Sequence, residues 1–327
     1  MKVFVTGVTG FVGRSLSDSL MDAHCDVTAL VRERILLLPK EVMQVAGGDL
    51  SAWSVKNSLF NSKIKQVLQD IDVVIHLAAR VHVMADNSND PLSEFRVVNR
   101  DATLVLARMA ADAGVKRFIF ISSVKVNGEM TSRDHPFKPD DNYIPTDPYG
   151  LSKYEAEQGL LALAKETGMK VVIIRPPLIY GPNVKANFAS MMKWVNKGIP
   201  LPLGAINNQR SLVALENLVG FILHCIDHPK AANEVFLISD GEDVSTTQLL
   251  RKVGQALNLQ SPSAIKAWLV PVPVSIMTFF AKLLGKGDMV NRLFGSLQVD
   301  SSKSRDLLGW EPVITMDEQL AKMAKDI

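Results

Sequence analysis

Tyr149 and Lys153 lie four residues apart in the run Asp147-Pro148-Tyr149-Gly150-Leu151-Ser152-Lys153. On a helix this spacing places the phenol and the ammonium on one face, where the lysine charge is expected to lower the phenol's pKa from about 10 toward neutral pH. A phenol of that kind can take up and return a proton. The pair is therefore predicted to assist hydride transfer, with Tyr149 as the proton shuttle.

A glycine-rich turn near the N-terminus supports this prediction. Gly7, Gly10 and Gly13 follow an apolar run, residues 2–5, and precede an amphipathic helical pattern. In a strand-turn-helix unit of this kind, backbone N–H groups and the helix dipole face an incoming pyrophosphate. The spacing is GxxGxxG, one residue longer than GxGxxG. We expect a dinucleotide cofactor here, in contact with Gly7, Thr9, Gly10, Phe11, Val12 and Gly13.

Arg32 directly follows the second expected strand, where an NAD-selective fold usually places a carboxylate on the ribose diol. A guanidinium suits a 2′-phosphate, so Arg32 slightly favours NADP(H) over NAD. The alternative is a solvated arginine stacked on the adenine. Asp49 and Leu50 are expected at the adenine amine and ring, unless Gly48-Asp49-Leu50 is an ordinary turn.

The small residues after His76 would let the backbone approach a dinucleotide, which makes Leu77, Ala78 and Ala79 candidate cofactor contacts. His76 itself is predicted to be a core histidine with its hydrogen bonds satisfied, not a catalyst. The six histidines and two cysteines have no metal-ligand spacing, so no metal site is predicted.

Short apolar runs alternate with helical patterns through the first 175 residues, which is typical of a parallel sheet covered on both faces. The predicted class is α/β, a doubly wound, Rossmann-like parallel sheet with a smaller, interleaved mixed α/β lobe. Such sheets bind ligands at the carboxyl ends of their strands. The expected strands are 3–6, 27–31, 43–45, 73–78, 118–122 and 171–175, and the expected helices are 12–23, 64–68, 92–113 and 149–166.

Prolines become frequent after Arg175, which indicates a change of lobe. Residues 1–175 are predicted to form the dinucleotide-binding domain, and 205–230 to return to it through a helix over 211–226. Residues 176–204 and 231–327 are predicted to form mainly the substrate-binding lobe, with a strand at 235–238 and a helix at 246–257. The uncharged stretch 267–281 is predicted to be a buried helix of that lobe; contact with a membrane surface is the alternative, and it is too short and too rich in proline to insert stably in a bilayer.

The formal charge is only +2, from 36 basic and 34 acidic residues, so no global field favours nucleic acid. No signal-peptide pattern begins the chain. Cys25 and Cys225 lie far apart in apolar runs, as expected of reduced, buried thiols. These features predict a cytoplasmic protein with no nucleic-acid partner, and they leave a homodimer open.

Together these motifs resemble the extended short-chain dehydrogenase/reductase family, in particular its nucleotide-sugar epimerases, dehydratases and reductases. The resemblance covers essentially the whole chain. It is carried by Thr6 to Gly13, Gly48 to Leu50, His76 to Ala79, Asn99, Ser122-Ser123, Tyr149 with Lys153, and Arg175 to Pro182.

The resemblance implies NAD(P) as cofactor and a nucleotide sugar as substrate. It makes Tyr149 the catalytic acid/base, Lys153 its electrostatic partner and a ribose ligand, and Ser123 the hydroxyl that binds the reacting sugar oxygen. Asn99 and Pro176 join the implied cofactor contacts. The implied substrate contacts are Ser123, Lys125, Asn127, Asn183, Lys193, Arg210 and Arg292, with Arg210 as a phosphate clamp.

The resemblance implies that the 4,6-dehydratases of the family have two acidic residues directly after the small hydroxyl residue. This chain has Val124 and Lys125 at those two positions. Removal of water needs an acid and a base at neighbouring carbons, and these side chains supply neither carboxyl group. The stretch Ser122 to Glu129 instead resembles bacterial polysaccharide enzymes that are UDP-N-acetylhexosamine 4-epimerases or 4-ketosugar reductases.

Three hypotheses follow. The first is a nucleotide-sugar 4-epimerase, for a UDP-hexose or UDP-N-acetylhexosamine, that oxidises C4 to a ketone and reduces it from the other face. The second is an NADPH-dependent nucleotide 4-ketosugar reductase that uses the same residues once per turnover. The third is a non-catalytic dinucleotide-binding sensor, against which the intact set of Ser123, Tyr149 and Lys153 argues.

Overall fold

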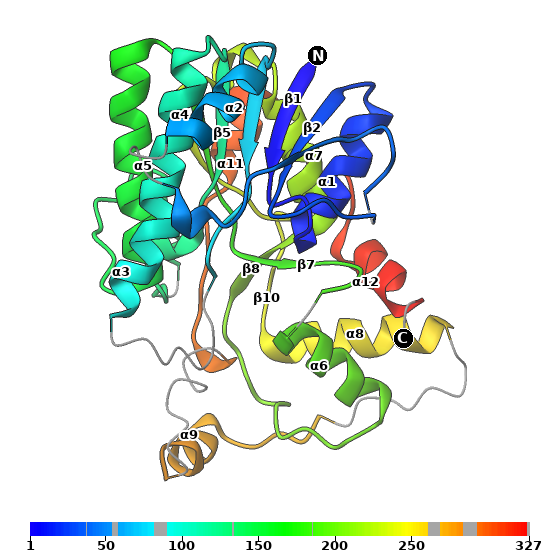
Figure 1. Ribbon diagram of the computed structural model, residues 1–327. Helices are drawn as coiled ribbons and strands as arrows, with labels where there is room; N and C mark the ends of the chain where they lie inside the picture. Colours follow the sequence, from blue (N-terminus) through cyan, green and yellow to red (C-terminus); the bar gives the residue numbers. More distant parts are fainter. Residues whose placement is uncertain are drawn as a thin grey trace.

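The protein is built around two β-sheets, shown in Figure 1. The computed structural model describes residues 1–36, 38–53, 58–81, 90–132, 134–184, 186–260, 269–283 and 293–325. A seven-stranded parallel sheet has the order β3-β2-β1-β4-β5-β6-β9, and a three-stranded mixed sheet has the order β10-β8-β7. The predicted doubly wound, Rossmann-like class with a smaller mixed α/β lobe is confirmed.

The large sheet aligns the carboxyl ends of its central strands. Thr6 on β1 pairs with Leu30 on β2 and with His76 on β4, so the segments that follow these strands leave the sheet at one edge. Its strands are β1 (Lys2–Thr6), β2 (Asp26–Val31), β3 (Met43–Ala46), β4 (Val73–His76), β5 (Arg117–Ile121), β6 (Lys170–Arg175) and β9 (Glu234–Leu237).

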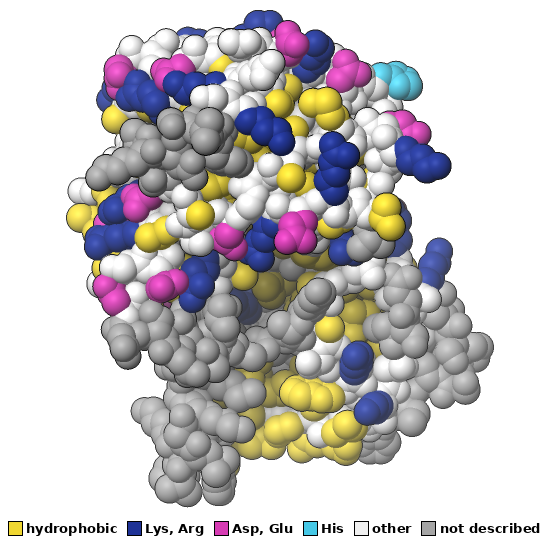
Figure 2. Space-filling model, in the orientation of Figure 1, with side chains coloured by type: hydrophobic (Ala, Val, Ile, Leu, Met, Phe, Trp, Pro, Cys, Tyr) yellow, Lys and Arg dark blue, Asp and Glu magenta, His cyan; other side chains and the backbone are white. Residues whose placement is uncertain are grey.

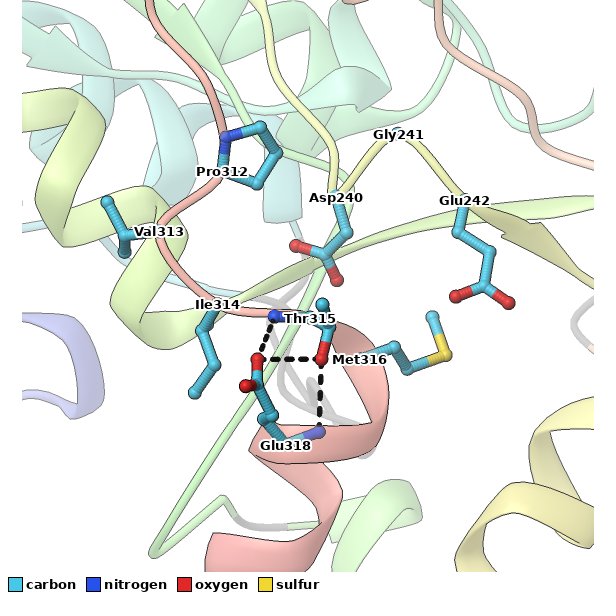
Figure 3. Close-up of a pocket in the computed structure, with 9 residues that line it drawn as sticks. All are labelled: Asp240, Gly241, Glu242, Pro312, Val313, Ile314, Thr315, Met316 and Glu318. Carbon is cyan, nitrogen blue, oxygen red and sulfur yellow. Dashed lines mark hydrogen bonds between the residues drawn. The ribbon is translucent and has the colours of Figure 1, made fainter.

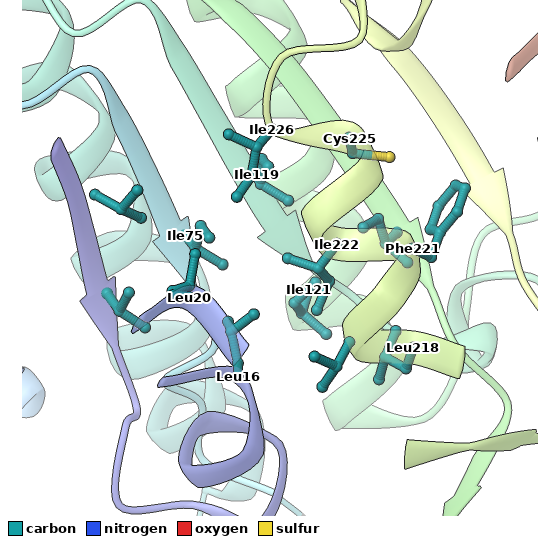
Figure 4. Close-up of a cluster of buried hydrophobic side chains, with 14 of the residues drawn as sticks. Leu16, Leu20, Ile75, Ile119, Ile121, Leu218, Phe221, Ile222, Cys225 and Ile226 are labelled. Carbon is teal, nitrogen blue, oxygen red and sulfur yellow. The ribbon is translucent and has the colours of Figure 1, made fainter. Parts of the chain in front are cut away.

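Helices cover both faces of this sheet, because its strands are apolar on both sides. On one face α1 (Phe11–Asp22), α7 (Leu215–Cys225) and α11 (Ser302–Leu308) bury residues such as Leu16, Phe221 and Ile222 against Ile75 and Ile119 (Figure 4). On the other face lie α2 (Ser58–Leu68), α4 (Ala102–Asp112) and α5 (Pro148–Thr167).

The smaller lobe has its own core around Tyr180, Phe188 and Leu250. In Figure 1 it lies below the carboxyl edge of the large sheet and holds the C-terminus. Its elements are β7 (Leu178–Tyr180), α6 (Ala186–Asn196), β8 (Arg210–Ala214), β10 (Asp243–Val244), α8 (Thr246–Gln260), α9 (Val274–Leu283) and α12 (Met316–Ala324).

Two predicted helices differ from the structure. The helix expected over 92–113 is divided into α3 (Pro91–Arg96), a π-helical segment (Val97–Asp101) in which Asn99 is buried, and α4. The helix expected over 211–226 begins only at Leu215, because residues 210–214 form β8 between β7 and β10. The 3.6-residue pattern does not reveal this paired strand. The strand expected over 73–78 ends at His76.

The strand predicted near 235–238 lies in the large sheet, where β9 pairs with β6, although the sequence placed 231–327 mainly in the smaller lobe. A four-residue apolar run does not specify which sheet it joins. The boundaries between the two lobes stay a prediction.

The buried helix predicted over 267–281 was wrong for the described residues. Pro271 and Pro273 precede α9, which begins at Val274, and Ile276 is 48% exposed. Pro271 and Pro273 both lack a backbone N–H, which explains why the helix does not begin earlier. Residues 267 and 268 lie outside the described residues.

Candidate active site

The turn after β1 is shaped to bring backbone close to a ligand. Gly7 has a φ of +76°, and a Cβ there would lie 2.8 Å from the Ala78 nitrogen; a Cβ on Gly13 would lie 2.2 Å from the Gly7 carbonyl oxygen. Glycine alone fits these two positions. The turn leads into α1, whose first turn has no acidic side chain, so its N–H groups are suited to a diphosphate.

Helix α5 positions the predicted catalytic pair. Asp147 accepts a hydrogen bond from the Gly150 N–H at 3.0 Å and caps the helix, and Pro148 occupies its first turn. Tyr149 therefore lies at the start of α5 and Lys153 one turn later. The Tyr149 ring meets the edge of Phe95 from α3, with ring centroids 5.8 Å apart.

Lys153 is buried one helical turn after Tyr149. Its Nζ donates to the Ile121 carbonyl at 2.9 Å and lies 4.4 Å from the centre of the Phe120 ring. Burial lowers the pKa of Lys153 to about 7, and the negative charge of Glu157 opposes this shift. The lysine is therefore close to its titration point near neutral pH.

The expected lowering of the Tyr149 pKa was wrong for this structure. Burial raises the pKa of the phenol to about 12, while its hydrogen bond with Ser123 acts in the opposite direction. Desolvation disfavours the phenolate, and at a pKa near 7 Lys153 is charged only part of the time near neutral pH. Ser123 and Tyr149 are nevertheless brought together, as the sequence predicted.

Ser123 caps a short 3₁₀ helix (Val124–Val126) after β5 by accepting from the Lys125 N–H at 3.2 Å. Val124 is buried, and its N–H donates to the Pro176 carbonyl at 3.0 Å. The Lys125 ammonium is paired with the Glu129 carboxylate. Neither position presents a carboxyl group beside the Ser123 hydroxyl.

A buried ion pair lies one helical turn beyond Lys153. The Glu157 carboxylate accepts from Arg175 Nε at 3.0 Å, from Arg175 Nη2 at 2.5 Å and from the Ser122 hydroxyl at 2.5 Å. Arg175 also donates to the Asn127 side-chain oxygen at 3.0 Å, and Asn127 donates to the Lys138 carbonyl at 2.7 Å. Asn127 therefore holds the segment near Lys138; its predicted contact with substrate stays a prediction.

A second buried network connects the glycine turn to α5 through His76, which is fully buried as predicted. Thr103 donates to the Asn99 carbonyl at 2.8 Å, so its oxygen must accept the Nε2 proton of His76 at 2.9 Å. His76 Nδ1 is then an acceptor for the Thr6 hydroxyl at 2.7 Å, and that hydroxyl accepts from the Ala78 N–H at 3.1 Å. Burial lowers the pKa of His76 to about 3, which keeps it neutral.

Asn99 extends this network to α5. Its side chain accepts from the Arg80 N–H at 2.9 Å and donates to the Arg80 carbonyl and to the Ser152 hydroxyl, both at 3.0 Å. Ser152 in turn donates to the Tyr149 carbonyl at 2.8 Å. The π-helical segment thus ties the backbone after β4 to the first turn of the catalytic helix; direct contact of Asn99 with the cofactor stays a prediction.

The candidate adenine residues lie at the rim of the same edge. The Arg32 side chain is 81% exposed, and its Nε lies 3.5 Å from the Asp49 carboxylate. Asp49 accepts from the Ser51 N–H at 2.8 Å, which lowers the pKa of this carboxyl group, and Leu50 begins a 3₁₀ helix (Leu50–Ala52).

The remaining predicted residues are distributed between the two lobes. Pro176 is buried directly after β6, and Leu77, Ala78 and Ala79 are half-buried after β4. Arg210 begins β8, half-buried, and its guanidinium donates to the Gly295 carbonyl at 3.2 Å. Asn183 lies in an exposed turn with a φ of +64°, and Lys193 is exposed on α6. Arg292 lies outside the described residues.

Sequence reasoning missed the groups that surround the catalytic pair. Phe95 and Phe120 contact Tyr149 and Lys153, and the charge of Glu157 acts on the pKa of Lys153, yet each looks like an ordinary core or helix residue in the sequence. For Glu157 the only available signal was its position four residues after Lys153.

A cavity of about 310 Å³ lies between the loop after β9 and the segment before α12, as Figure 3 shows. The Asp240 carboxylate accepts from the Tyr180 hydroxyl, the Ala214 N–H and the Asn217 amide, each at 2.7 Å. Its acceptor sites are thus used to join β7, β8 and α7. Glu318, also at this cavity, forms a capping box with Thr315.

Among the described residues, no three His, Cys, Asp and Glu side chains are placed to hold a metal ion. None of the helices in this described part of the chain is long and apolar enough to cross a membrane. Cys225 is a buried free thiol, whereas Cys25, also free, is only half-buried.

The chain fits a dinucleotide at this edge, because the glycine cradle, the open N-terminus of α1 and the small residues after β4 adjoin the Tyr149 and Lys153 pair in the fold. The family model described as "NAD dependent epimerase/dehydratase family" matches residues 3–239. A UDP-glucose 4-epimerase from Vibrio cholerae is 49% identical over 326 residues, which cover 99% of this chain and 94% of that protein.

Solved structures share the fold. The UDP-glucose 4-epimerase of Thermotoga maritima, solved with UDP-glucose, superposes with a TM-score of 0.76 at 23% identity and covers 99% of this chain and 98% of its own. The UDP-glucuronic acid 4-epimerase of Bacillus cereus, solved with NAD, gives 0.74 at 22% identity and covers 100% and 99%. The chain belongs to the NAD-dependent epimerase/dehydratase family, within the extended short-chain dehydrogenases/reductases, and is an NAD(P)-dependent enzyme.

Proposed function

We propose that this protein is a nucleotide-sugar 4-epimerase whose substrate is a UDP-hexose or a UDP-N-acetylhexosamine. The observation that carries the proposal is the meeting of Ser123, Tyr149 and Lys153 at the carboxyl edge, beside Val124 and Lys125 instead of two acids. The similarity to the Vibrio cholerae UDP-glucose 4-epimerase over 99% of this chain supports it.

The residues have distinct roles in this proposal. Ser123 binds the sugar O4, and Tyr149, which must be present as the phenolate for this step, accepts the O4 proton as C4 is oxidised and returns it after the ketone has turned to present its other face. Lys153, when charged, stabilises the phenolate. A bound nicotinamide would accept and return the hydride at C4. Because one proton and one hydride leave and both return, the reaction has no net redox change.

The substrate's diphosphate is assigned to Arg210, with Asn183 as a further contact in the smaller lobe; the contact predicted for Lys193 is not kept in this proposal, because its side chain is exposed on α6. Arg210 is suited to this role because a guanidinium binds phosphate with two parallel hydrogen bonds. Burial lowers the pKa of Arg210, as expected where a cation is held away from water. An incoming diphosphate would compensate that charge.

The preference for NADP(H) stays a proposal that rests on Arg32. Its ion pair with Asp49 places a negative charge beside the guanidinium, which opposes a 2′-phosphate. Arg32 therefore favours NADP(H) less in the structure than in the sequence alone.

To test this, the purified protein is incubated with NAD and one nucleotide sugar at a time: UDP-glucose, UDP-galactose or one of their N-acetylated forms. We expect the C4 epimer at unchanged mass, detected by proton NMR, in both directions with at least one pair. The Tyr149→Phe variant is the control for chemistry at this site. A product that has lost water would contradict the role given to Val124 and Lys125.

The 4-ketosugar reductase is the second candidate, and the exposed Arg32 is the observation that favours it. A reductase adds two hydrogens to a 4-keto sugar and oxidises one nicotinamide per turnover. Stoichiometric loss of absorbance at 340 nm with a 4-keto sugar, and no epimer from the UDP-hexoses, would replace the epimerase proposal. No turnover with any nucleotide sugar would instead favour a non-catalytic sensor.

A further inference from the structure

The charge of this protein is unevenly distributed, although its formal total is only +2. Residues 176–209 contain Lys185, Lys193 and Lys197 and no acidic residue. Residues 244–287 contain five basic residues, Arg251, Lys252, Lys266, Lys282 and Lys286, and again no acidic residue. Among the described residues of these segments, Lys193, Lys197 and Arg251 are exposed, whereas Lys252 is paired with Glu242 and Asp317. The near-neutral total therefore conceals two segments that contain basic residues and no acidic residue.

Large apolar side chains are exposed in the same two segments. Trp194 is 45% exposed, Ile199 43%, Val270 44% and Ile276 48%. On the face drawn in Figure 2, yellow and dark blue side chains appear among white atoms on the described part of the smaller lobe, and the magenta side chains lie on the other lobe. Exposed apolar groups that are grouped with cations and separated from anions call for an explanation.

Backbone contacts make part of this surface continuous. The Ile199 N–H donates to the Trp194 carbonyl at 3.3 Å, the Val270 N–H donates to the Leu201 carbonyl at 2.8 Å, and the Gly204 N–H donates to the Val270 carbonyl at 3.0 Å. Lys193 and Lys197 lie one helical turn apart at the exposed end of α6. We call Lys193, Trp194, Lys197, Ile199 and Val270 the small-lobe patch.

The patch differs from several other exposed apolar residues of the protein. Met130 directly follows Glu129, Val313 lies two residues after Glu311, and Ile144 lies three residues after Asp141. An acidic neighbour makes contact with an anionic surface unfavourable. The small-lobe patch has no acidic residue within its segments, so its charge and its apolar groups favour the same kind of partner.

We propose that the small-lobe patch docks the protein on an anionic lipid bilayer. Trp194 and the aliphatic side chains would enter the headgroup region, where an indole ring is favourably placed, while Lys193 and Lys197 face anionic headgroups. In Figure 1, α6 and α9 lie at the end of the molecule away from the large sheet. The carboxyl edge of that sheet with the glycine turn and Tyr149, which we call the cofactor edge, therefore does not need to contact the lipid.

The test is sedimentation of the full-length protein with vesicles of phosphatidylcholine alone or mixed with phosphatidylglycerol. We expect binding to the mixed vesicles, little binding to phosphatidylcholine, and weaker binding as salt is added. Lys197→Gln should weaken the partition coefficient about fivefold, the usual effect of one basic side chain near an anionic surface. Trp194→Ser should weaken it roughly tenfold.

Matched controls lie on the other lobe. Leu36→Ser removes a fully exposed aliphatic side chain, and Lys165→Gln removes an exposed lysine at the end of α5; both should change binding less than twofold. All four variants should keep sugar turnover and the thermal unfolding temperature. Equal losses in patch and control variants, or no binding of the wild type to either vesicle, would overturn the proposal.

A contact between two copies of this chain is the rival occupant. If Trp194→Ser changed the sedimentation coefficient of the protein in the absence of vesicles while vesicle binding was unaffected, the patch would be a protein interface and the lipid proposal would be wrong.

Discussion

The cofactor edge and the small-lobe patch use polar side chains in opposite ways. At the edge, His76, Lys153, Glu157 and Arg175 are buried, and each has defined hydrogen-bond partners. On the patch, Lys193 and Lys197 are exposed beside apolar groups. Buried polar groups fix one geometry, because each lost partner is costly, whereas exposed groups can change with little effect on the fold. The cofactor edge is therefore suited to a reaction that needs one fixed geometry. The patch is suited to a contact whose residues can change without affecting the fold.

The largest expected effect is at the centre of the edge. Tyr149→Phe keeps the ring against Phe95 but removes the hydroxyl that meets Ser123. We expect turnover to fall about 10²-fold or more, the usual scale for an acid/base group, with little change in cofactor affinity. Steady-state rates and cofactor titration by fluorescence measure the two quantities separately. Turnover at the level of the wild type would remove the phenol from the chemistry.

Glu157→Gln tests whether the buried ion pair supports the site as well as the fold. Loss of the negative charge leaves Arg175 buried without its carboxylate, and we expect the free energy of unfolding to fall by about 3 kcal/mol or more. Urea unfolding measures this loss. Glu155→Gln on the same helix, where the carboxylate pairs with Arg96 and Arg100 and is 22% exposed, should cost less than about 1 kcal/mol.

The same variant should also change the pH dependence. Because Glu157 opposes the lowering of the Lys153 pKa to about 7, its neutralisation should move that pKa further down. Any limb of the pH-rate profile that reports on Lys153 should then shift to lower pH. A destabilised variant with an unshifted profile would limit Glu157 to a structural role.

His76→Leu removes the link between the glycine turn and α5. The Thr6 and Thr103 hydroxyls would lose their partner, so we expect a loss of about 2 kcal/mol in the free energy of unfolding and weaker cofactor binding. His76→Asn places an amide oxygen near the position of Nδ1 and should recover part of the cofactor affinity. Cofactor affinity unchanged in both variants would confine the network to stability.

The contribution of His76 to the free energy of unfolding should depend on pH in a defined direction. Its pKa falls from 6.5 to about 3 on folding, so the unfolded chain binds a proton between those values that the folded protein does not. Stability from this residue is present above pH 6.5 and is lost as the pH falls toward 3. The leucine variant should lack this part of the pH dependence, measured as the free energy of unfolding against pH.

The sequence predicted the edge better than the patch for a physical reason. Residues that follow parallel strands must meet at one edge, so Gly7 and Ser123 could be placed together from strand order alone, whereas the role of Tyr149 followed from its spacing to Lys153 and from the family resemblance. The partners of a buried charge follow no such rule: Glu157 meets Arg175, 18 residues away, only because α5 packs beside β6. Exposure is also a property of the whole fold, which is why 267–281 was expected to be buried.

The smallest expected effect is at the exposed rim, where Arg32 lies 3.5 Å from Asp49. Arg32→Ala should weaken NADP(H) binding by up to about tenfold, since one charged hydrogen bond contributes about 1.5 kcal/mol or more and solvent screens this site. NAD(H) binding should fall less, because only NADP(H) has the 2′-phosphate. Arg34→Ala, at another exposed arginine two residues on, is the control and should leave both affinities unchanged. Titration of each variant with the two cofactors measures both affinities. If Arg32→Ala lost affinity for NAD(H) and NADP(H) equally, Arg32 would be assigned to stacking on the adenine, and its charge would not select between the two cofactors.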